Sequence, residues 1–117
     1  KGKEYILLTN APRPNNVVKD FLRKMGMEED IIQHVFTSGE ASLSYLKKNF
    51  MDKKFFHVGP PRDIDLFKDF EEMKSDQIEN AEFIICTGLF EEQEEDLKYY
   101  KELFEKNLKK KMICTNP

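Results

Sequence analysis

Short apolar runs alternate with longer amphipathic segments along the whole chain. Apolar runs lie within residues 5–9, 34–40, 53–62, 81–90 and 111–117, and we predict a strand in each. Residues 15–27, 41–50, 64–73 and 91–111 place their apolar side chains at helical spacing, which predicts helices. Strands that alternate with such helices are typical of an α/β fold with a parallel, helix-covered sheet.

Polar residues and glycines suggest where some of these helices begin and end. Asn15 or Asn16 is the expected N-cap of the first helix, and Gly26 is its expected exit. The helix at 91–111 begins with acidic residues and ends with lysines, the order that the helix dipole favours. The acidic segment Glu28 to Asp30 is expected to be a connector.

Composition limits the class of protein. With 117 residues, the chain is long enough for one compact domain or for a piece of a larger one. The formal charge is −3 and the basic residues are scattered, so no surface for nucleic acid is predicted. No apolar run approaches the roughly 20 residues of a membrane helix, and no signal peptide is evident, so we expect a cytoplasmic protein without a membrane partner.

The chain has two cysteines, Cys86 and Cys114. Each follows an apolar run and precedes a threonine, without the close pairing of a metal knuckle. We interpret them as buried, reduced thiols.

Small polar residues recur where the predicted strands end, in ILLTN, VFTSG, FHVGP, IICTG and MICTN. The carboxyl edge of a parallel sheet is where α/β folds bind ligands, and small residues there leave room for a phosphate or sugar. The alternative is that Thr, Asn and Gly are simply good turn and cap residues.

The ordered series ILLTNAPRP, a helix ending in MGM, VFTSGEA, FHVGPPRD, EFIICTGLF and MICTNP resembles one family. It is similar to the subclass IIA, or NagD-like, phosphatases of the haloacid dehalogenase (HAD) superfamily, over essentially the whole chain. The resemblance implies that residues 1–46 are a portion of the HAD-like core and residues 47–117 a portion of the C2-type cap.

The resemblance also implies roles for individual residues. Thr9 would be the motif II hydroxyl that hydrogen-bonds a phosphoryl oxygen, and Asn10 would shape the substrate loop. Arg13 and Arg62 are candidate substrate contacts, although a solvated loop arginine and a local ion pair of Arg62 with Asp63 are alternatives. The implied reaction is Mg²⁺-dependent hydrolysis of a small phosphorylated metabolite, of the sugar phosphate or nucleotide class, through an aspartyl-phosphate.

The nucleophile of that family, an Asp-x-Asp after an apolar strand, is missing before Ile6. The single Asp-x-Asp is Asp63-Ile64-Asp65, which follows a Gly-Pro-Pro-Arg loop, and we interpret Asp63 as an N-cap. We expect the nucleophile and the metal ligands to lie outside this chain, so that the chain is an inactive piece of a longer enzyme or a natural remnant that only binds.

Two other functions stay open. One is a non-catalytic ligand-binding module of the flavodoxin or receiver type, and the other is an oligomerisation module, since caps of this kind often bury surface between identical subunits.

Overall fold

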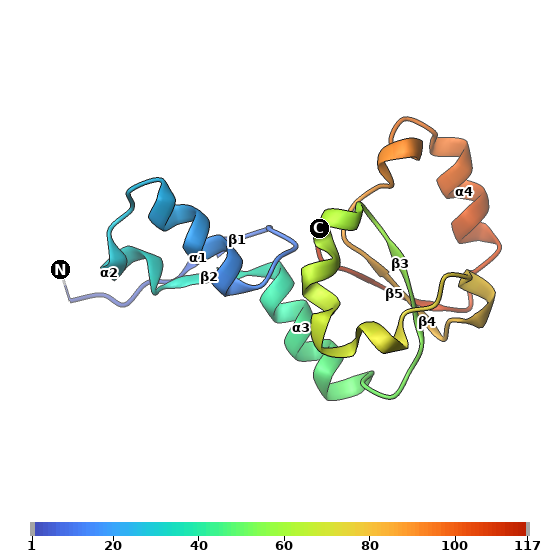
Figure 1. Ribbon diagram of the computed structural model, residues 1–117, viewed down its shortest axis with the longest axis horizontal. Helices are drawn as coiled ribbons and strands as arrows, with labels where there is room; N and C mark the ends of the chain where they lie inside the picture. Colours follow the sequence, from blue (N-terminus) through green and yellow to red (C-terminus); the bar gives the residue numbers. More distant parts are fainter. Residues whose placement is uncertain (1, 117) are drawn as a thin grey trace.

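The computed structural model describes residues 2–116 and contains two separate parallel sheets (Figure 1). In the first sheet β1 (Leu7–Thr9) pairs with β2 (Val35–Thr37). In the second, β4 (Phe83–Cys86) lies between β3 (Phe55–Val58) and β5 (Lys111–Cys114). Every pairing is parallel, so the predicted fold class is confirmed.

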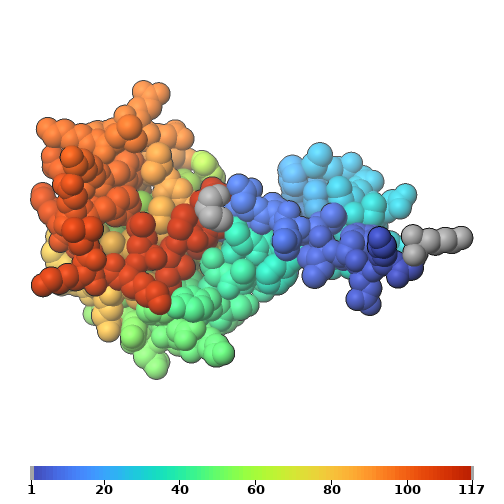
Figure 2. All heavy atoms as spheres, turned by 180° about the vertical axis from the view of Figure 1, so that it is seen from behind, coloured from blue at the N-terminus to red at the C-terminus, as the bar shows by residue number. Residues whose placement is uncertain are grey.

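The two sheets belong to two lobes that one helix connects. The first lobe, residues 2–37, adds α1 (Asn15–Lys24) and α2 (Glu29–Ile32) to its sheet. The second lobe, residues 50–116, adds α4 (Leu97–Glu105) and the 3₁₀ segments η1 (Pro61–Met73), η2 (Ile78–Asn80) and η3 (Glu91–Gln93). Helix α3 (Ser38–Asn49) starts directly after β2 and runs from the first lobe to the second (Figure 1). Figure 2 shows that the first lobe is the narrower of the two. Residues 1 and 117, at the ends of the two predicted domains, lie outside the described residues.

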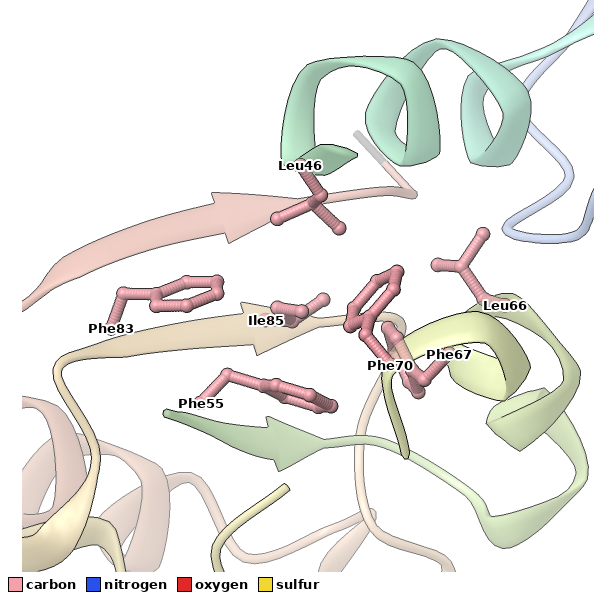
Figure 3. Close-up of a cluster of buried hydrophobic side chains, with 7 residues drawn as sticks. All are labelled: Leu46, Phe55, Leu66, Phe67, Phe70, Phe83 and Ile85. Atoms are coloured by element: carbon pink, nitrogen blue, oxygen red, sulfur yellow. The ribbon is translucent and has the colours of Figure 1, made fainter. Parts of the chain in front are cut away.

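The second lobe contains the main core. Strand residues alternate between the two faces of its sheet. On one face, side chains from β3 and β4 pack against α3 and η1, as Figure 3 shows, and this cluster consists of Leu46, Phe55, Leu66, Phe67, Phe70, Phe83 and Ile85. On the other face, α4 contributes Tyr100 to a second cluster with Val58, Ile78 and Ile84. The sheet is therefore covered on both sides, as expected for a parallel sheet.

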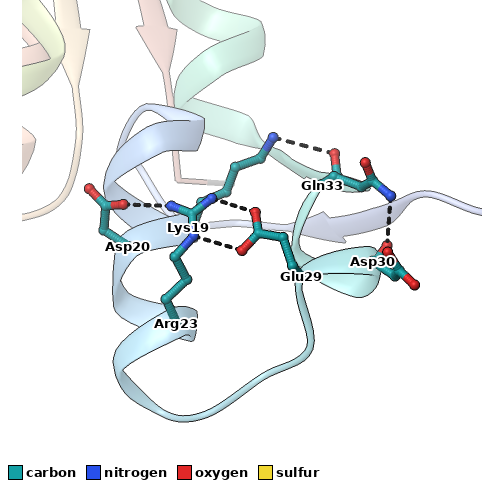
Figure 4. Close-up of polar contacts among 6 residues, drawn as sticks. All are labelled: Lys19, Asp20, Arg23, Glu29, Asp30 and Gln33. Atoms are coloured by element: carbon teal, nitrogen blue, oxygen red, sulfur yellow. Dashed lines mark hydrogen bonds and ion pairs between the residues drawn. The ribbon is translucent and has the colours of Figure 1, made fainter.

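The first lobe buries few of its own apolar side chains. None of the residues of α1 is buried, and Ile6 and Leu8 are 68% and 79% exposed. An ion pair holds α2 to α1 instead (Figure 4): Arg23 on α1 lies 2.6 Å from Glu29 on α2. Arg23 also pairs with Asp20, within α1, at 2.7 Å. The hydrogen bonds from Arg23 hold the pKa of the Glu29 carboxyl below its usual value. These exposed pairs give this lobe less stability than a packed core would.

The first helix begins at Asn15, where it was predicted to begin, but the predicted N-cap was wrong, whereas the predicted exit was confirmed. Pro14 occupies the N-cap position of α1, and no side chain caps this end. Asn15 instead accepts a hydrogen bond from the Thr37 amide at 2.9 Å, so tertiary contact with β2 replaces local capping. Gly26 has φ +83°, a left-handed conformation that glycine adopts without strain.

Two other predicted segments differ from the structure. The acidic connector contributes to the short helix α2. The predicted helix at 91–111 is shorter, because α4 begins only after Asp96, whose side chain accepts a hydrogen bond from the Tyr99 amide. Like charges in the acidic run before Asp96 disfavour a continuous helix, and only Glu91–Gln93 forms a separate 3₁₀ turn there.

Candidate active site

The loop of residues 10–14 follows β1 and is fixed against the start of α3. The Thr37 hydroxyl donates a hydrogen bond to the Arg13 carbonyl at 2.6 Å and accepts one from the Glu40 amide at 2.9 Å, which caps the helix. The Gly39 amide donates to the Ala11 carbonyl at 3.0 Å. A Cβ atom on Gly39 would lie 2.4 Å from the Arg13 amide nitrogen, so only glycine permits this approach.

A pocket of about 860 Å³ lies where this loop meets the carboxyl ends of the second sheet. We call it the interlobe pocket. Segments that follow β3, β4 and β5 form most of its wall, and the loop after β1 closes it. Its lining residues are Pro12, Arg13, Pro60, Arg62, Asp63, Cys86, Thr87, Gly88, Leu89, Glu91, Glu94 and Asn116. The strand ends of a parallel sheet thus form a polar pocket, at the edge where such folds bind ligands.

The two arginines of the interlobe pocket are both paired with carboxylates. Arg13 Nε lies 3.7 Å from Asp63 Oδ1, and this ion pair joins the two lobes. Arg62 pairs with Glu91, not with its neighbour Asp63, so the local ion pair is not formed. The predicted N-cap role of Asp63 was also wrong: Pro60 is the N-cap of η1, and Asp63 lies in the first turn, buried against Arg13.

Thr9 and Asn10 lie outside the interlobe pocket. Thr9 is half-buried at the carboxyl end of β1 and lines a separate, mostly apolar pocket of about 370 Å³ between β1 and α1. Its Oγ1 accepts a hydrogen bond from the Ala11 amide at 3.2 Å. Asn10 is exposed. Of the four candidate site residues, the structure therefore brings Arg13 and Arg62 together and separates them from Thr9 and Asn10.

The other threonines at strand ends have internal partners. Thr37, Thr87 and Thr115 are 1%, 1% and 0% exposed. Thr37 caps α3, Thr115 donates to the Cys86 carbonyl at 3.4 Å, and Thr87 bonds His57. For these three residues the cap and packing interpretation is the correct one.

Both histidines are packed against other side chains, as predicted. The rings of His34 and Tyr5 are 4.6 Å apart, and those of His57 and Phe67 are 4.9 Å apart. His57 Nε2 also lies 2.8 Å from Thr87 Oγ1. Burial, with a smaller contribution from Lys74, lowers the pKa of His57 to about 4, so the ring is neutral at pH 7.

The close approach of the segments that follow β3 and β4 was not predicted from the sequence. Gly59 has φ +149°, and a Cβ atom on it would lie 2.0 Å from Thr87 Oγ1. The Gly-Pro-Pro sequence after β3 was the available signal, since a glycine there permits close contact.

The cysteine prediction was only partly correct. Both thiols are free, but Cys86 is half-buried and Cys114 is exposed. Cys114 is accessible because it lies at the end of β5, an edge strand of the sheet.

The described residues do not fit a magnesium site. Within residues 2–116, no three His, Cys, Asp or Glu side chains are grouped so that they could hold a metal ion.

No helix in this part of the chain is long and apolar enough to cross a membrane.

Comparisons with known proteins agree with the resemblance seen in the sequence. The sequence model of the haloacid dehalogenase-like hydrolase family matches residues 1–71. A crystal structure of a haloacid dehalogenase-like hydrolase from Brucella suis 1330 is similar over 96% of this chain, with 27% identity and a TM-score of 0.77. A second structure, a putative nagD protein, is similar over 97% of the chain with 24% identity and a TM-score of 0.62, which supports the fold.

No curated protein matches the chain. The chain spans 41% and 43% of the two solved chains, less than half of their length. Since the family match covers more than half of the 117 residues, the chain belongs to the haloacid dehalogenase-like hydrolase family.

Proposed function

We propose that this chain is part of a phosphomonoester hydrolase of the HAD type. Its substrate would be a small phosphorylated metabolite, of the sugar phosphate or nucleotide class. A carboxylate outside this chain would attack the phosphoryl group and form an aspartyl-phosphate, which water then hydrolyses. Membership of the hydrolase family supports the reaction class.

The hydrogen bonding of Thr9 is the observation that carries this proposal. A threonine hydroxyl has one donor and two acceptor sites. The Ala11 amide occupies an acceptor site of Thr9, and no hydrogen bond donated by Thr9 is found within residues 2–116. Its O–H is therefore available to donate a hydrogen bond, whereas Thr37 and Thr115 donate theirs to carbonyl groups. A free hydroxyl donor at a strand end suits a phosphoryl oxygen that gains charge in the transition state.

The open edge of β1 offers a place for the attacking group. Within the described residues β1 pairs with β2 alone. The exposed side chains of Leu8 on β1 and of Ile6 just before it are an apolar surface that an adjoining element would cover. We propose that the strand carrying the nucleophile lies beside β1 and runs parallel to it. The carboxyl end of that strand would then lie next to Thr9, which ends β1.

The second lobe is proposed to act as the cap, with residues 1–46 in the core and 47–117 in the cap. Arg13 and Arg62 would contact a part of the substrate that lies in the interlobe pocket, outside the phosphoryl site proposed at Thr9. Because each is paired with a carboxylate, an anionic substrate would compete with Asp63 and Glu91 for them. Asn10, exposed in the loop between Thr9 and Arg13, would shape the entrance.

The remaining parts of the proposal concern the whole polypeptide. Its magnesium ligands would lie outside this chain, its location would be cytoplasmic, and identical subunits could associate through the cap.

The test is a phosphatase assay on the complete polypeptide that contains this chain. We expect release of inorganic phosphate from at least one sugar phosphate or nucleotide in a panel of phosphomonoesters, with Mg²⁺ present and not after chelation. The 117-residue chain alone serves as control and should release none. Turnover by this chain alone would contradict the proposal that the nucleophile lies outside it. Failure of the complete polypeptide to hydrolyse any phosphomonoester in the panel would contradict the proposed phosphatase function.

A further inference from the structure

The two cysteines of the chain are direct neighbours across two strands. Cys86 on β4 is in register with Cys114 on β5, and both residues end their strands. Side chains in register on neighbouring parallel strands project from the same face of the sheet. The chain has two cysteines in total, 28 positions apart in sequence, and the fold brings them side by side.

Their spacing suits a covalent bond. Neighbouring strands lie about 4.8 Å apart, within the range of about 4.4–6.8 Å that a disulfide spans between Cα atoms. The two thiols also differ in accessibility: Cys114 is exposed, while Cys86 is half-buried against the second core cluster, which includes Tyr100 of α4. An oxidant therefore reaches Cys114 first.

We propose that Cys86 and Cys114 form a reversible disulfide when the protein meets a hydroperoxide. The Cys114 thiolate attacks the peroxide oxygen, the O–O bond breaks, and a sulfenic acid forms on Cys114 with release of hydroxide. The Cys86 sulfur then attacks the Cys114 sulfur, an S–S bond forms, and the sulfenic oxygen leaves as water with the Cys86 proton. Two thiols lose two electrons, and hydrogen peroxide is reduced to two molecules of water.

The order of these steps follows from the environment of each thiol. Burial, together with the neighbouring Cys114, raises the pKa of the Cys86 thiol, which makes Cys86 a poor first nucleophile. Cys86 is better placed to resolve a sulfenic acid on its neighbour. Because Cys114 is exposed, a reducing thiol can reach the bond and break it again.

The bond would act at the wall of the interlobe pocket. Cys86 lines this pocket, and Asn116, two residues after Cys114, lines it as well. Joining the ends of β4 and β5 would thus restrict the segments that form the pocket. The disulfide itself does not depend on the proposed phosphatase activity.

Mass spectrometry of the protein without reductant tests the proposal. After treatment with hydrogen peroxide, we expect a monomer lighter by two hydrogen atoms, with both thiols protected from alkylation. Trypsin should then release residues 75–98 linked to the peptide that begins at Met112. Dithiothreitol should restore both thiols.

Single variants separate the two roles. In Cys86→Ser, Cys114 should remain as a sulfenic acid that dimedone labels, whereas Cys114→Ser should leave Cys86 largely unmodified at the same peroxide dose. Far-UV circular dichroism identifies any variant that fails to fold. If a variant does not fold, the disulfide-linked tryptic peptides of the wild-type protein still decide the proposal. Free thiols after peroxide treatment, or linkage only between two chains, would overturn the proposal.

Discussion

The guanidinium of Arg13 and the carboxylate of Asp63 form an ion pair across the two lobes, with Nε and Oδ1 3.7 Å apart. The two side chains are not equally accessible, since Asp63 is 6% exposed and Arg13 is 35% exposed. A carboxylate buried to this degree needs a partner, and the loop after β1 supplies it. The loop that follows the proposed catalytic threonine is thus connected to the second lobe.

Removal of Arg13 should therefore destabilise the protein. In Arg13→Met, the carboxylate of Asp63 keeps its burial and loses its cation, so we expect the free energy of unfolding to fall by about 1–2 kcal/mol, less than for a fully buried pair. Urea unfolding at pH 7 measures this. The matched control is Arg62→Met, whose partner Glu91 is exposed, and its cost should stay below about 1 kcal/mol. Equal costs for the two variants would contradict the structural role of Arg13.

Gly39 should not tolerate a methyl group, whereas Gly88 should. In Gly39→Ala, the new Cβ would lie 2.4 to 2.7 Å from backbone atoms of Arg13, so the loop must move, at a cost of about 2 kcal/mol or more. In Gly88→Ala, the Cβ would lie 3.5 Å from Pro60 Cδ, an ordinary contact. Thermal unfolding of the two variants checks this difference. A melting temperature for Gly39→Ala at or above that of Gly88→Ala would show that the loop is not held against α3 as described.

Acid should destabilise the protein through His57. The pKa of His57 is about 4 in the folded protein and 6.5 in an unfolded chain, so below about pH 6.5 the unfolded chain binds the proton more readily. Stability should fall between pH 6.5 and pH 4 and should not fall further on account of His57 below pH 4. His57→Gln removes this titration while keeping a polar group near Thr87.

We expect wild type to lose about 2 kcal/mol more than His57→Gln between pH 7 and pH 4.5, measured by urea unfolding at each pH. Parallel stability curves for the two proteins would mean that His57 is protonated as readily in the folded state as in the unfolded chain.

Thr9 gives a kinetic prediction for the complete polypeptide. Thr9→Val removes the free hydroxyl with little change in volume, so we expect kcat for the best phosphomonoester substrate to fall about 10- to 1,000-fold, as for loss of one transition-state donor. Thr9→Ser keeps the hydroxyl and should retain most of the activity. Steady-state kinetics with a circular dichroism check of both variants measures this. Unchanged turnover in Thr9→Val would remove Thr9 from the mechanism while leaving the family membership intact.

Local sequence patterns were sufficient for much of the fold. Each of the five predicted strands is present, and α3 follows β2 directly, because apolar runs and helical periodicity depend on residues close in sequence. The error at Asn15 has the opposite origin. Asparagine is a good N-cap residue, but the Asn15 side chain accepts a hydrogen bond from the Thr37 amide of β2, which is remote in sequence, and does not cap the helix.

The sequence by itself determined the α/β class, the strand positions and the family resemblance, because hydrophobic spacing and ordered motifs are local properties. Tertiary structure decided which groups meet: Arg13 with Asp63, His57 with Thr87, and Cys86 beside Cys114. It also separated Thr9 from the pocket that Arg13 and Arg62 line. The physical reason is that ion pairs, buried hydrogen bonds and strand register depend on distances between segments remote in sequence, which local propensity does not specify.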